Sequence, residues 1–206
     1  MFRTRHLLTP ALVVAMSWAT LQGAAESTQA ADAFARKMTL ISEHGSLAAA
    51  RGSAAALPRR TPVSETEVNS WFAYRAQPML PEGLSQPKLT IIGGGRVMGG
   101  ATVDLEAIGK RKSSGGGALD VWSYLGGRVP ITVTGVLHTE AGRGRFEIQA
   151  ADVSGIPLPR TLLQEVVSYY SRTPEHPEGI RLDEAFALPA NIQKIEVGSG
   201  QAVVVQ

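Results

Sequence analysis

Cysteine is absent from this chain of 206 residues. Its absence excludes disulfide bonds, thiolate metal sites and a cysteine nucleophile. It also excludes the bacterial export signal that is lipid-modified on a cysteine. The stability of the fold must therefore come from its core, which 44% hydrophobic residues are enough to build.

Aromatic residues and net charge are also scarce. Aromatics make up 6% of the chain beside 22 glycines, a mixture that favours strands and turns over a long helical bundle. The formal net charge is only +2, and without residues 1–25, which hold Arg3 and Arg5 but no acid, basic and acidic residues are equal in number. A balanced charge gives little support for nucleic-acid binding, and we expect no such partner.

The first 25 residues have the pattern of an export signal. The basic start "MFRTRH" is followed by the apolar run "LLTPALVVAMSWATL" and then by the small residues of "QGAAES". We expect a signal peptide over residues 1–25, with cleavage near Ala25 or, as a second choice, at 31–33. An uncleaved N-terminal anchor is the alternative, although the run is short for a membrane span. The expected location is the periplasm or the outside of the cell.

The remaining chain divides at about residue 60. Residues 26–60 are predicted to be a partly helical or flexible N-terminal segment and linker, with a helix over 32–44 and the linker after Gly45. Residues 61–206 are predicted to form a single domain. At its start Ser64 and Glu67 have the spacing of a capping box, and the helix that follows must end by about Gln77.

Alternating apolar residues predict strands in "KLTII", "RVMGGATVDLEAI", "RVPITVTGVLHTE" and "RFEIQAADV". The sequences "GGG" and "AGRG" read as hairpin turns, and "QKIEVGSGQAVVV" as a terminal hairpin. Connections this short join antiparallel strands. A second helix is expected after Pro159. The sequence therefore predicts an α+β fold in which both helices pack on one face of an antiparallel sheet.

The glycine-rich stretch 95–102, "GRVMGGAT", does not bind a nucleotide. It has the glycine spacing of a phosphate-binding loop, but Ala101 stands where that loop needs its lysine, and a strand follows instead of a helix. A dinucleotide-binding loop fails in the same way at Met98. We interpret the stretch as a glycine turn and a strand with small residues, and expect no nucleotide.

No residue pattern predicts a metal, a cofactor or a catalytic site. The histidines after the signal, His44, His138 and His176, have no second ligand at metal spacing. Asp104 and Glu106 alternate on a strand and read as a solvated face. With His138 they leave a hydrolase as a third hypothesis, although we expect no enzyme. The basic loop 109–117 reads as a solubilising loop or as a contact for anionic lipid head groups.

Three segments carry a family resemblance: "SETEVNSWF", with Asn69 early in the helix, "GRFEIQAADVSGIPLPRTLLQEVV", and the ending "FALPANIQKIEVGSGQAVVVQ". Together, residues 61–206 resemble bacterial envelope proteins of the tubular lipid-binding-like (TULIP-like) type. The resemblance implies a curved antiparallel sheet that cradles one or two amphipathic helices, a groove for acyl chains, and no catalysis.

Small residues along a strand face leave room that helix side chains or an apolar ligand can fill. The leading hypothesis is an exported, non-enzymatic cell-envelope protein that binds a lipid or other apolar ligand between helix and sheet. The alternative is an envelope interaction or assembly module with a filled core, whose partner is a membrane surface or envelope protein. The residues expected to line the groove are Trp71, Phe72, Val97, Val103, Leu105, Val133, Leu137, Leu162, Val166 and Tyr170.

Overall fold

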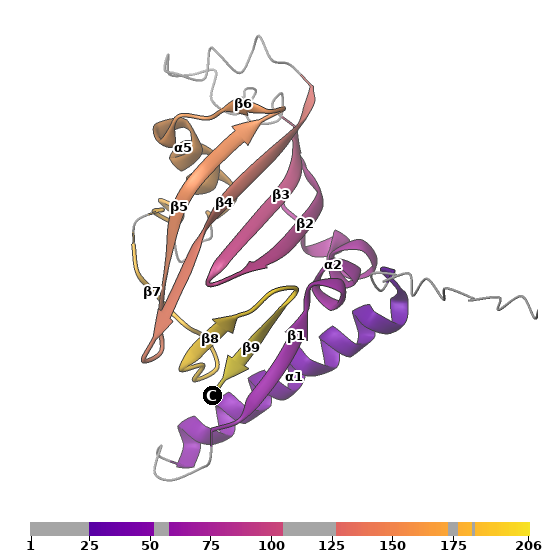
Figure 1. The fold of residues 1–206 in the computed structure, drawn as a ribbon, viewed down its shortest axis with the longest axis vertical. Coiled ribbons are helices and arrows are strands. Elements are labelled where there is room, and N and C mark those ends of the chain that lie inside the picture. Colours follow the sequence, from indigo (N-terminus) through magenta and orange to yellow (C-terminus); the bar gives the residue numbers. More distant parts are fainter. Residues whose placement is uncertain (1–24, 52–57, 105–126, 173–176, 183) are drawn as a thin grey trace, which may run out of the picture.

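A computed structural model describes residues 25–51, 58–104, 127–172, 177–182 and 184–206. These residues form an α+β fold with three α-helices and two antiparallel sheets, as the sequence predicts for the class (Figure 1). The expected signal sequence before Ala25 and the basic loop 109–117 lie outside the described residues. Among the helices that are described, none has the length and apolar character needed to cross a membrane.

The helix α2 (Glu65–Tyr74) begins with the predicted capping box. The backbone N–H of Glu67 donates to Ser64 Oγ at 3.2 Å, and the backbone N–H of Ser64 donates to Glu67 Oε2 at 2.9 Å. These bonds satisfy backbone donors that the first turn of a helix leaves free. The helix ends three residues before the short 3-10 helix η1 (Gln77–Met79), which contains Pro78.

The larger sheet has six strands, all antiparallel to their neighbours. Its order is β2 (Leu84–Gly93), β3 (Arg96–Asp104), β4 (Arg128–Glu140), β5 (Arg143–Val153) and β6 (Ile156–Pro157), with β7 (Phe186–Ala187) on the other half of the outer edge of β5. Both predicted hairpin turns are confirmed. In the first, Gly94 and Gly95 have φ of 61° and 82°, the left-handed conformation that glycine adopts without strain.

The smaller sheet joins the two ends of the domain, in the order β1 (Arg60–Ser64), β9 (Gln201–Val205) and β8 (Lys194–Val197). The predicted terminal hairpin is its β8–β9 pair. The expectation of one sheet was wrong, because β1 pairs with a strand at the far end of the chain and no local pattern encodes that contact. Thr139 links the sheets: its Oγ1 donates to the Ile195 carbonyl and accepts from the Ile195 N–H, both at 2.9 Å.

The N-terminal helix α1 (Thr28–Arg51) is longer than predicted, because it continues through Gly45, where a linker was expected. A Cβ at Gly45 would lie 2.3 Å from the Ala190 carbonyl oxygen, so this glycine marks a close contact rather than a helix end. Ile41 of α1 packs in a core cluster with Leu188 and Ile192. Met38, one turn before Ile41 on the same helix, is 48% exposed.

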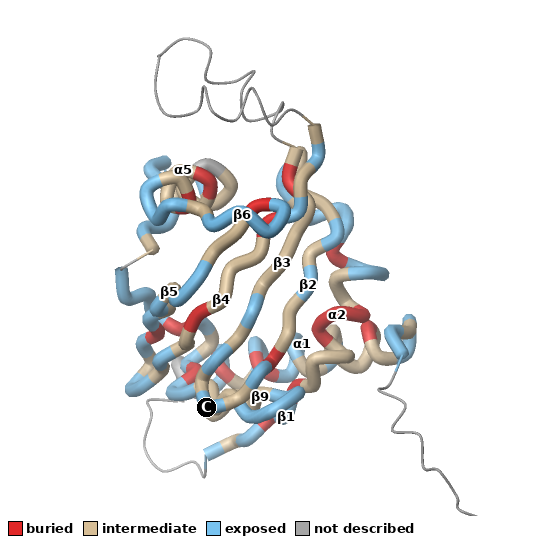
Figure 2. Tube along the Cα trace, turned by 45° about the horizontal axis from the view of Figure 1, so that its top comes forward, coloured by how far each residue is buried: buried red, intermediate tan, exposed pale blue. Residues whose placement is uncertain are grey.

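The helix α5 (Arg160–Tyr170) starts after Pro159 as predicted and covers one end of the larger sheet. The expectation that both helices pack on one sheet face was wrong, since α2 lies against the outer edge of β2. Buried residues accordingly gather in two zones, beside α5 and around α1 and α2, while the middle of the sheet is mostly intermediate in exposure (Figure 2).

Side chains of α2 form hydrogen bonds with backbone groups on the outer edge of β2. The Asn69 amide donates to the Leu89 carbonyl and accepts from the Leu89 N–H, both at 2.8 Å. One turn earlier, Glu65 Oε2 accepts from the Ile91 N–H at 2.6 Å. Asn69 is only 6% exposed, so these bonds are well shielded from water. They fix the position of α2 against the sheet and bring Phe72 to the edge of an apolar cavity between α5 and the sheet.

Candidate functional site

An apolar cavity of about 340 Å³ lies between α5 and the larger sheet, and we call it the groove. Its floor comes from β3 and β4, its roof from α5, and its side wall from β2 and Phe72 of α2. The residues that line it are Phe72, Leu84, Pro87, Lys88, Leu89, Gly99, Gly100, Ala101, Val103, Ile131, Val133, Leu163, Val166, Val167 and Tyr170. Lys88 is the one charged residue among them.

The groove exists because β3 carries small residues where its neighbours carry large ones. Gly99 lies between Leu89 and Val133 in the sheet register, and a Cβ built on Gly99 would meet nothing within 4 Å. The next residue on this face is Ala101. A sheet row of this kind leaves volume that the side chains of α5 do not fill.

The neighbouring Gly100 differs from Gly99 in direction. Successive residues of a strand point to opposite faces, so a side chain at Gly100 would point away from the groove. Its Cβ would make ordinary contact with the Ile131 carbonyl oxygen at 3.6 Å and with Thr132 Cγ2 at 3.7 Å. A larger side chain at position 99 would therefore reduce the volume of the groove, whereas one at position 100 would not. Comparing substitutions at the two positions distinguishes the loss of groove volume from other effects of a larger side chain in β3.

The helix α5 forms a well-packed roof at one end of the groove. Leu163 is 1% exposed, and Val166 joins a core cluster with Val103, Ile131 and Val153 of the sheet. One end of the groove is therefore bounded by well-packed core residues, which fix the position of its lining near α5.

Five of the ten residues predicted from the sequence line the groove: Phe72, Val103, Val133, Val166 and Tyr170. The others lie elsewhere. Leu162 packs against the core under α5, Trp71 contacts Phe34 with ring centroids 5.7 Å apart, and Val97 pairs with Gly135 farther along the sheet. Leu137 lines a second hollow, and Leu105 is outside the described residues.

Sequence reasoning missed the contribution of β2, which supplies Leu84, Pro87, Lys88 and Leu89. No local pattern in β2 shows that α2 covers only part of this strand. The other missed residues had a signal: Leu163 and Val167 share the apolar stripe of α5, and Ile131 shares the alternation of β4.

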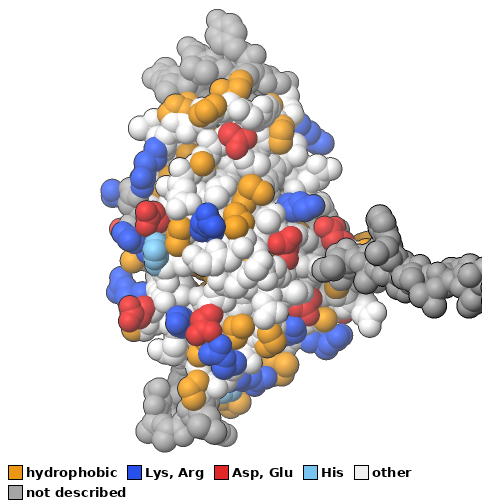
Figure 3. All heavy atoms as spheres, in the orientation of Figure 1, with side chains coloured by type: hydrophobic (Ala, Val, Ile, Leu, Met, Phe, Trp, Pro, Cys, Tyr) orange, Lys and Arg blue, Asp and Glu red, His pale blue; other side chains and the backbone are white. Residues whose placement is uncertain are grey.

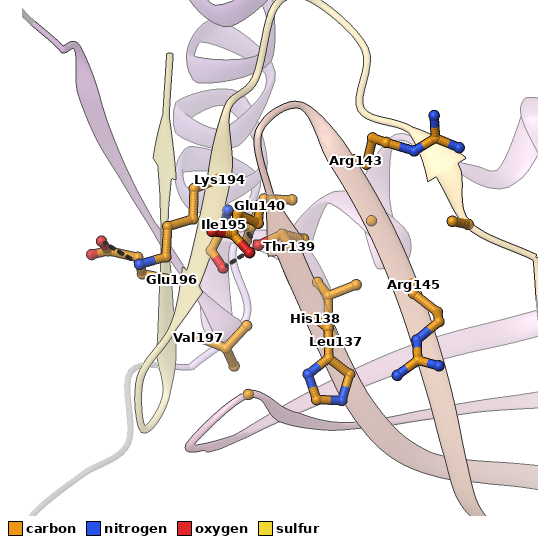
Figure 4. Close-up of a pocket in the computed structure, with 13 residues that line it drawn as sticks. Leu137, His138, Thr139, Glu140, Arg143, Arg145, Lys194, Ile195, Glu196 and Val197 are labelled. Carbon is orange, nitrogen blue, oxygen red and sulfur yellow. Dashed lines mark hydrogen bonds and ion pairs between the residues drawn. The ribbon is translucent and has the colours of Figure 1, made fainter.

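The second hollow, which we call the polar hollow, measures about 590 Å³ and lies between the β4–β5 hairpin and β8 (Figure 4). Its lining residues are Gly95, Leu137, His138, Thr139, Glu140, Arg143, Gly144, Arg145, Ala185, Lys194, Ile195, Glu196 and Val197. Charged side chains of both signs gather on the face of the molecule shown in Figure 3, beside largely uncharged surface over the middle of the sheet.

Two acids in and beside the polar hollow already have side-chain partners. Glu196 contacts Arg60 at 2.5 Å and Lys194 at 3.4 Å, and the hydrogen bond from Arg60 is the main reason that the pKa of Glu196 is lowered. His138 Nε2 lies 3.1 Å from Glu147 Oε2 across the β4–β5 pair. Glu196 is therefore matched by two cations, and Glu147 is in contact with a histidine.

The structure contradicts a hydrolase built on Asp104 and His138. Asp104 pairs in the sheet register with Arg128 at the start of β4, and its carboxylate lies 3.9 Å from Arg128 Nε. His138 lies near the other end of β4, about 30 Å away at the usual rise of a strand. Glu106, the other acid considered, lies outside the described residues, as does His176. Within the described part of the chain, no three His, Asp or Glu residues group as metal ligands.

Comparisons with protein-family models, with curated proteins and with solved structures find no match. The geometry of the groove and of the polar hollow is therefore what indicates a function.

Proposed function

We propose that this chain is an exported, non-enzymatic cell-envelope protein that binds a lipid or another apolar ligand in the groove. The observation that carries the proposal is the open space over Gly99 between α5 and the sheet. The resemblance of residues 61–206 to tubular lipid-binding-like proteins points the same way, and it stays a prediction.

The chemistry of the lining supports an apolar occupant. Ligand sites usually measure about 300–1,000 Å³ and combine apolar walls with a few polar groups. At about 340 Å³ the groove is at the lower end of that range, and Lys88 and Tyr170 are the only residues of its lining that have polar side chains. Apolar cavities of this kind exclude water and take up hydrocarbon. The size suits one acyl chain or a compact hydrocarbon better than a complete two-chain lipid.

The energy of such binding comes from removing hydrocarbon from water, at about 0.8 kcal/mol for each buried methylene group. A chain of several methylene groups in the groove therefore gains enough free energy to offset its lost freedom of motion. Apart from Lys88, at the β2 side of the groove, the lining has no charged residue.

The alternative, an interaction or assembly module with a filled core, has one observation in its favour. Within the described residues, no strand pairs with the outer edge of β5 over residues 145–150. An unpaired edge is a place where another strand can add. The groove favours the ligand, because a module with a filled core needs no space there.

The test compares Gly99→Leu with Gly100→Leu. Leucine at position 99 enters the groove, whereas leucine at position 100 points to the opposite face. Neither glycine has a positive φ, so neither change strains the backbone. The protein is isolated from its native host, and bound molecules are extracted and identified by mass spectrometry. Binding of a fluorescent fatty acid is measured in parallel.

We expect the unchanged protein and Gly100→Leu to carry the same apolar molecules, and Gly99→Leu to lose them and to bind the fluorescent fatty acid at least about tenfold more weakly. Repeated isolation of ligand-free protein that also ignores the fatty acid would overturn the proposal. Equal binding by the two variants would also overturn it, because it would place the ligand outside the groove.

A further inference from the structure

Two arginines stand side by side in the polar hollow. Arg143 and Arg145 are two residues apart on β5, so their side chains leave the same face of the strand. In the β4–β5 register they lie opposite Glu140 and His138. Both arginines are exposed, and Figure 4 shows both guanidinium groups extending from β5 at the side of the hollow.

Neither arginine is neutralised by the described part of the chain. No ion pair or side-chain hydrogen bond joins Arg143 or Arg145 to another described residue. The nearby acids are engaged elsewhere, Glu147 with His138 and Glu196 with Arg60 and Lys194. Glu140, opposite Arg143, forms no ion pair with it. Three cationic side chains, Arg143, Arg145 and Lys194, therefore line the hollow together with two acids, Glu140 and Glu196, which leaves one positive charge in excess.

A concave surface strengthens the field of such charges, because its walls keep part of the water away. Arginine presents a planar fork of donors that matches the oxygens of a phosphate group two at a time. The two same-face positions are about 7 Å apart along the strand. Figure 4 shows the two guanidinium groups pointing apart, and rotation of these long side chains can bring both forks to one compact anion with several oxygens. An extended acidic peptide would be better matched by a stripe of charges along the sheet.

We propose that the polar hollow binds a phosphate group through Arg143 and Arg145. The phosphate belongs either to a lipid head group or to a free phosphate ion, and both sources have the same chemistry at the arginines. The hollow opens on the sheet face that carries His138 and Arg145, opposite the face that carries Ile131 and Val133 in the groove. The proposal therefore stands independently of the apolar ligand.

The test uses the double variant Arg143→Gln/Arg145→Gln. Its control is Arg36→Gln/Arg181→Gln, which removes the same charge from two other exposed arginines. Arg36 is on α1 and Arg181 follows α5, and neither has an ion-pair partner among the described residues. Thermal unfolding of all variants checks that each is folded. Should the double variant not fold, the single variant Arg145→Gln takes its place.

Two arms identify the source of the phosphate. In the first, inorganic phosphate is titrated while the amide signals of Gly95 and Gly144, which line the hollow, are followed by NMR. In the second, the protein is sedimented with vesicles of phosphatidylcholine, with and without phosphatidylglycerol. With each arginine contributing about a fivefold gain near an anionic surface, the double variant should bind the anionic vesicles about 25-fold more weakly, and the control should match the unchanged protein.

Each result decides the proposal. Saturable amide shifts with phosphate that disappear in the double variant support a free-phosphate site. Vesicle binding that depends on phosphatidylglycerol and on the two arginines, without such shifts, supports a lipid head group. No response in either arm overturns the proposal, as does a double variant that behaves like its control.

Discussion

At the scale of single residues, Asn69 has the clearest consequence for stability. Its amide makes two hydrogen bonds to the backbone of Leu89 while being 6% exposed. Asn69→Leu would leave a backbone N–H and a carbonyl without partners, which should lower the free energy of unfolding by about 2–4 kcal/mol. Urea denaturation measures this loss.

Asn69→Asp is the matched variant. It keeps the acceptor for the Leu89 N–H but replaces the donor to the Leu89 carbonyl with a charged oxygen, so it should also destabilise the protein. If Asn69→Leu unfolds within about 0.5 kcal/mol of the unchanged protein, the role given to Asn69 is wrong.

How well a residue's role can be predicted depends on the distance to its partner along the chain. Ser64 and Glu67 were assigned correctly, because both members of a capping box lie within one helical turn. Asn69 was noticed only as part of a resemblance, since its partner Leu89 is 20 residues away. Gly99 was recognised as a place without a side chain, but only the assembled sheet shows that the space stays open.

At the scale of elements, Glu67 joins two helices as well as capping one. Its carboxylate contacts Lys37 of α1 at 2.7 Å. Partial burial alone would raise the pKa of Glu67, but hydrogen bonds from Lys37 and Ser64, together with the charge of Lys37, outweigh burial and lower it. A lowered pKa in the folded state means that this stabilisation is complete above the ordinary glutamate pKa of about 4.3 and is lost as pH falls through the folded value.

Glu67→Gln removes this dependence while glutamine still serves in a capping box. We therefore expect the unchanged protein to be the more stable form at neutral pH, and the difference to shrink as the pH falls below about 4.3. Urea midpoints for both forms across this range provide the measurement. Parallel pH profiles would show that Glu67 does not couple the helices in this way.

The elements themselves were largely predictable, but their placement was not. Apolar spacing gave the start of α5 after Pro159, and the turn glycines gave the β2–β3 hairpin. Gly45 misled the prediction of α1, because a glycine that ends a helix and a glycine that allows close packing look alike in a sequence. That α5 covers only one end of the sheet depends on packing, so four of the ten expected groove residues lie elsewhere, and Leu105 is outside the described residues.

At the scale of the whole molecule, the volume of the groove limits the length of the chain that it can hold. For a series of saturated fatty alcohols, each added methylene should tighten binding about fourfold, which corresponds to about 0.8 kcal/mol. The gain should stop when the volume of about 340 Å³ is filled. Displacement of a fluorescent fatty acid measures the series, with Gly100→Leu as the control.

In Gly99→Leu, the affinity should stop rising at a shorter alcohol chain, because the leucine side chain occupies part of the same volume. Affinity that does not change with chain length would contradict a groove that holds the chain.

At this scale the fold class could be predicted from the sequence, because short connections allow only antiparallel neighbours. The pairing of β1 with β9 could not, since it joins residues more than a hundred positions apart.

The larger sheet has edges of unequal character. On β2, Asn69 and Glu65 bond Leu89 and Ile91, the Gly200 N–H bonds the Ile91 carbonyl, and Pro87 has no N–H to offer. A foreign strand therefore finds no template there. Among the described strands, none pairs with the outer edge of β5 over residues 145–150, between β6 and β7. A second copy added at this segment of β5, edge to same edge, would make a closed pair, because each molecule would then have used the segment that joins them.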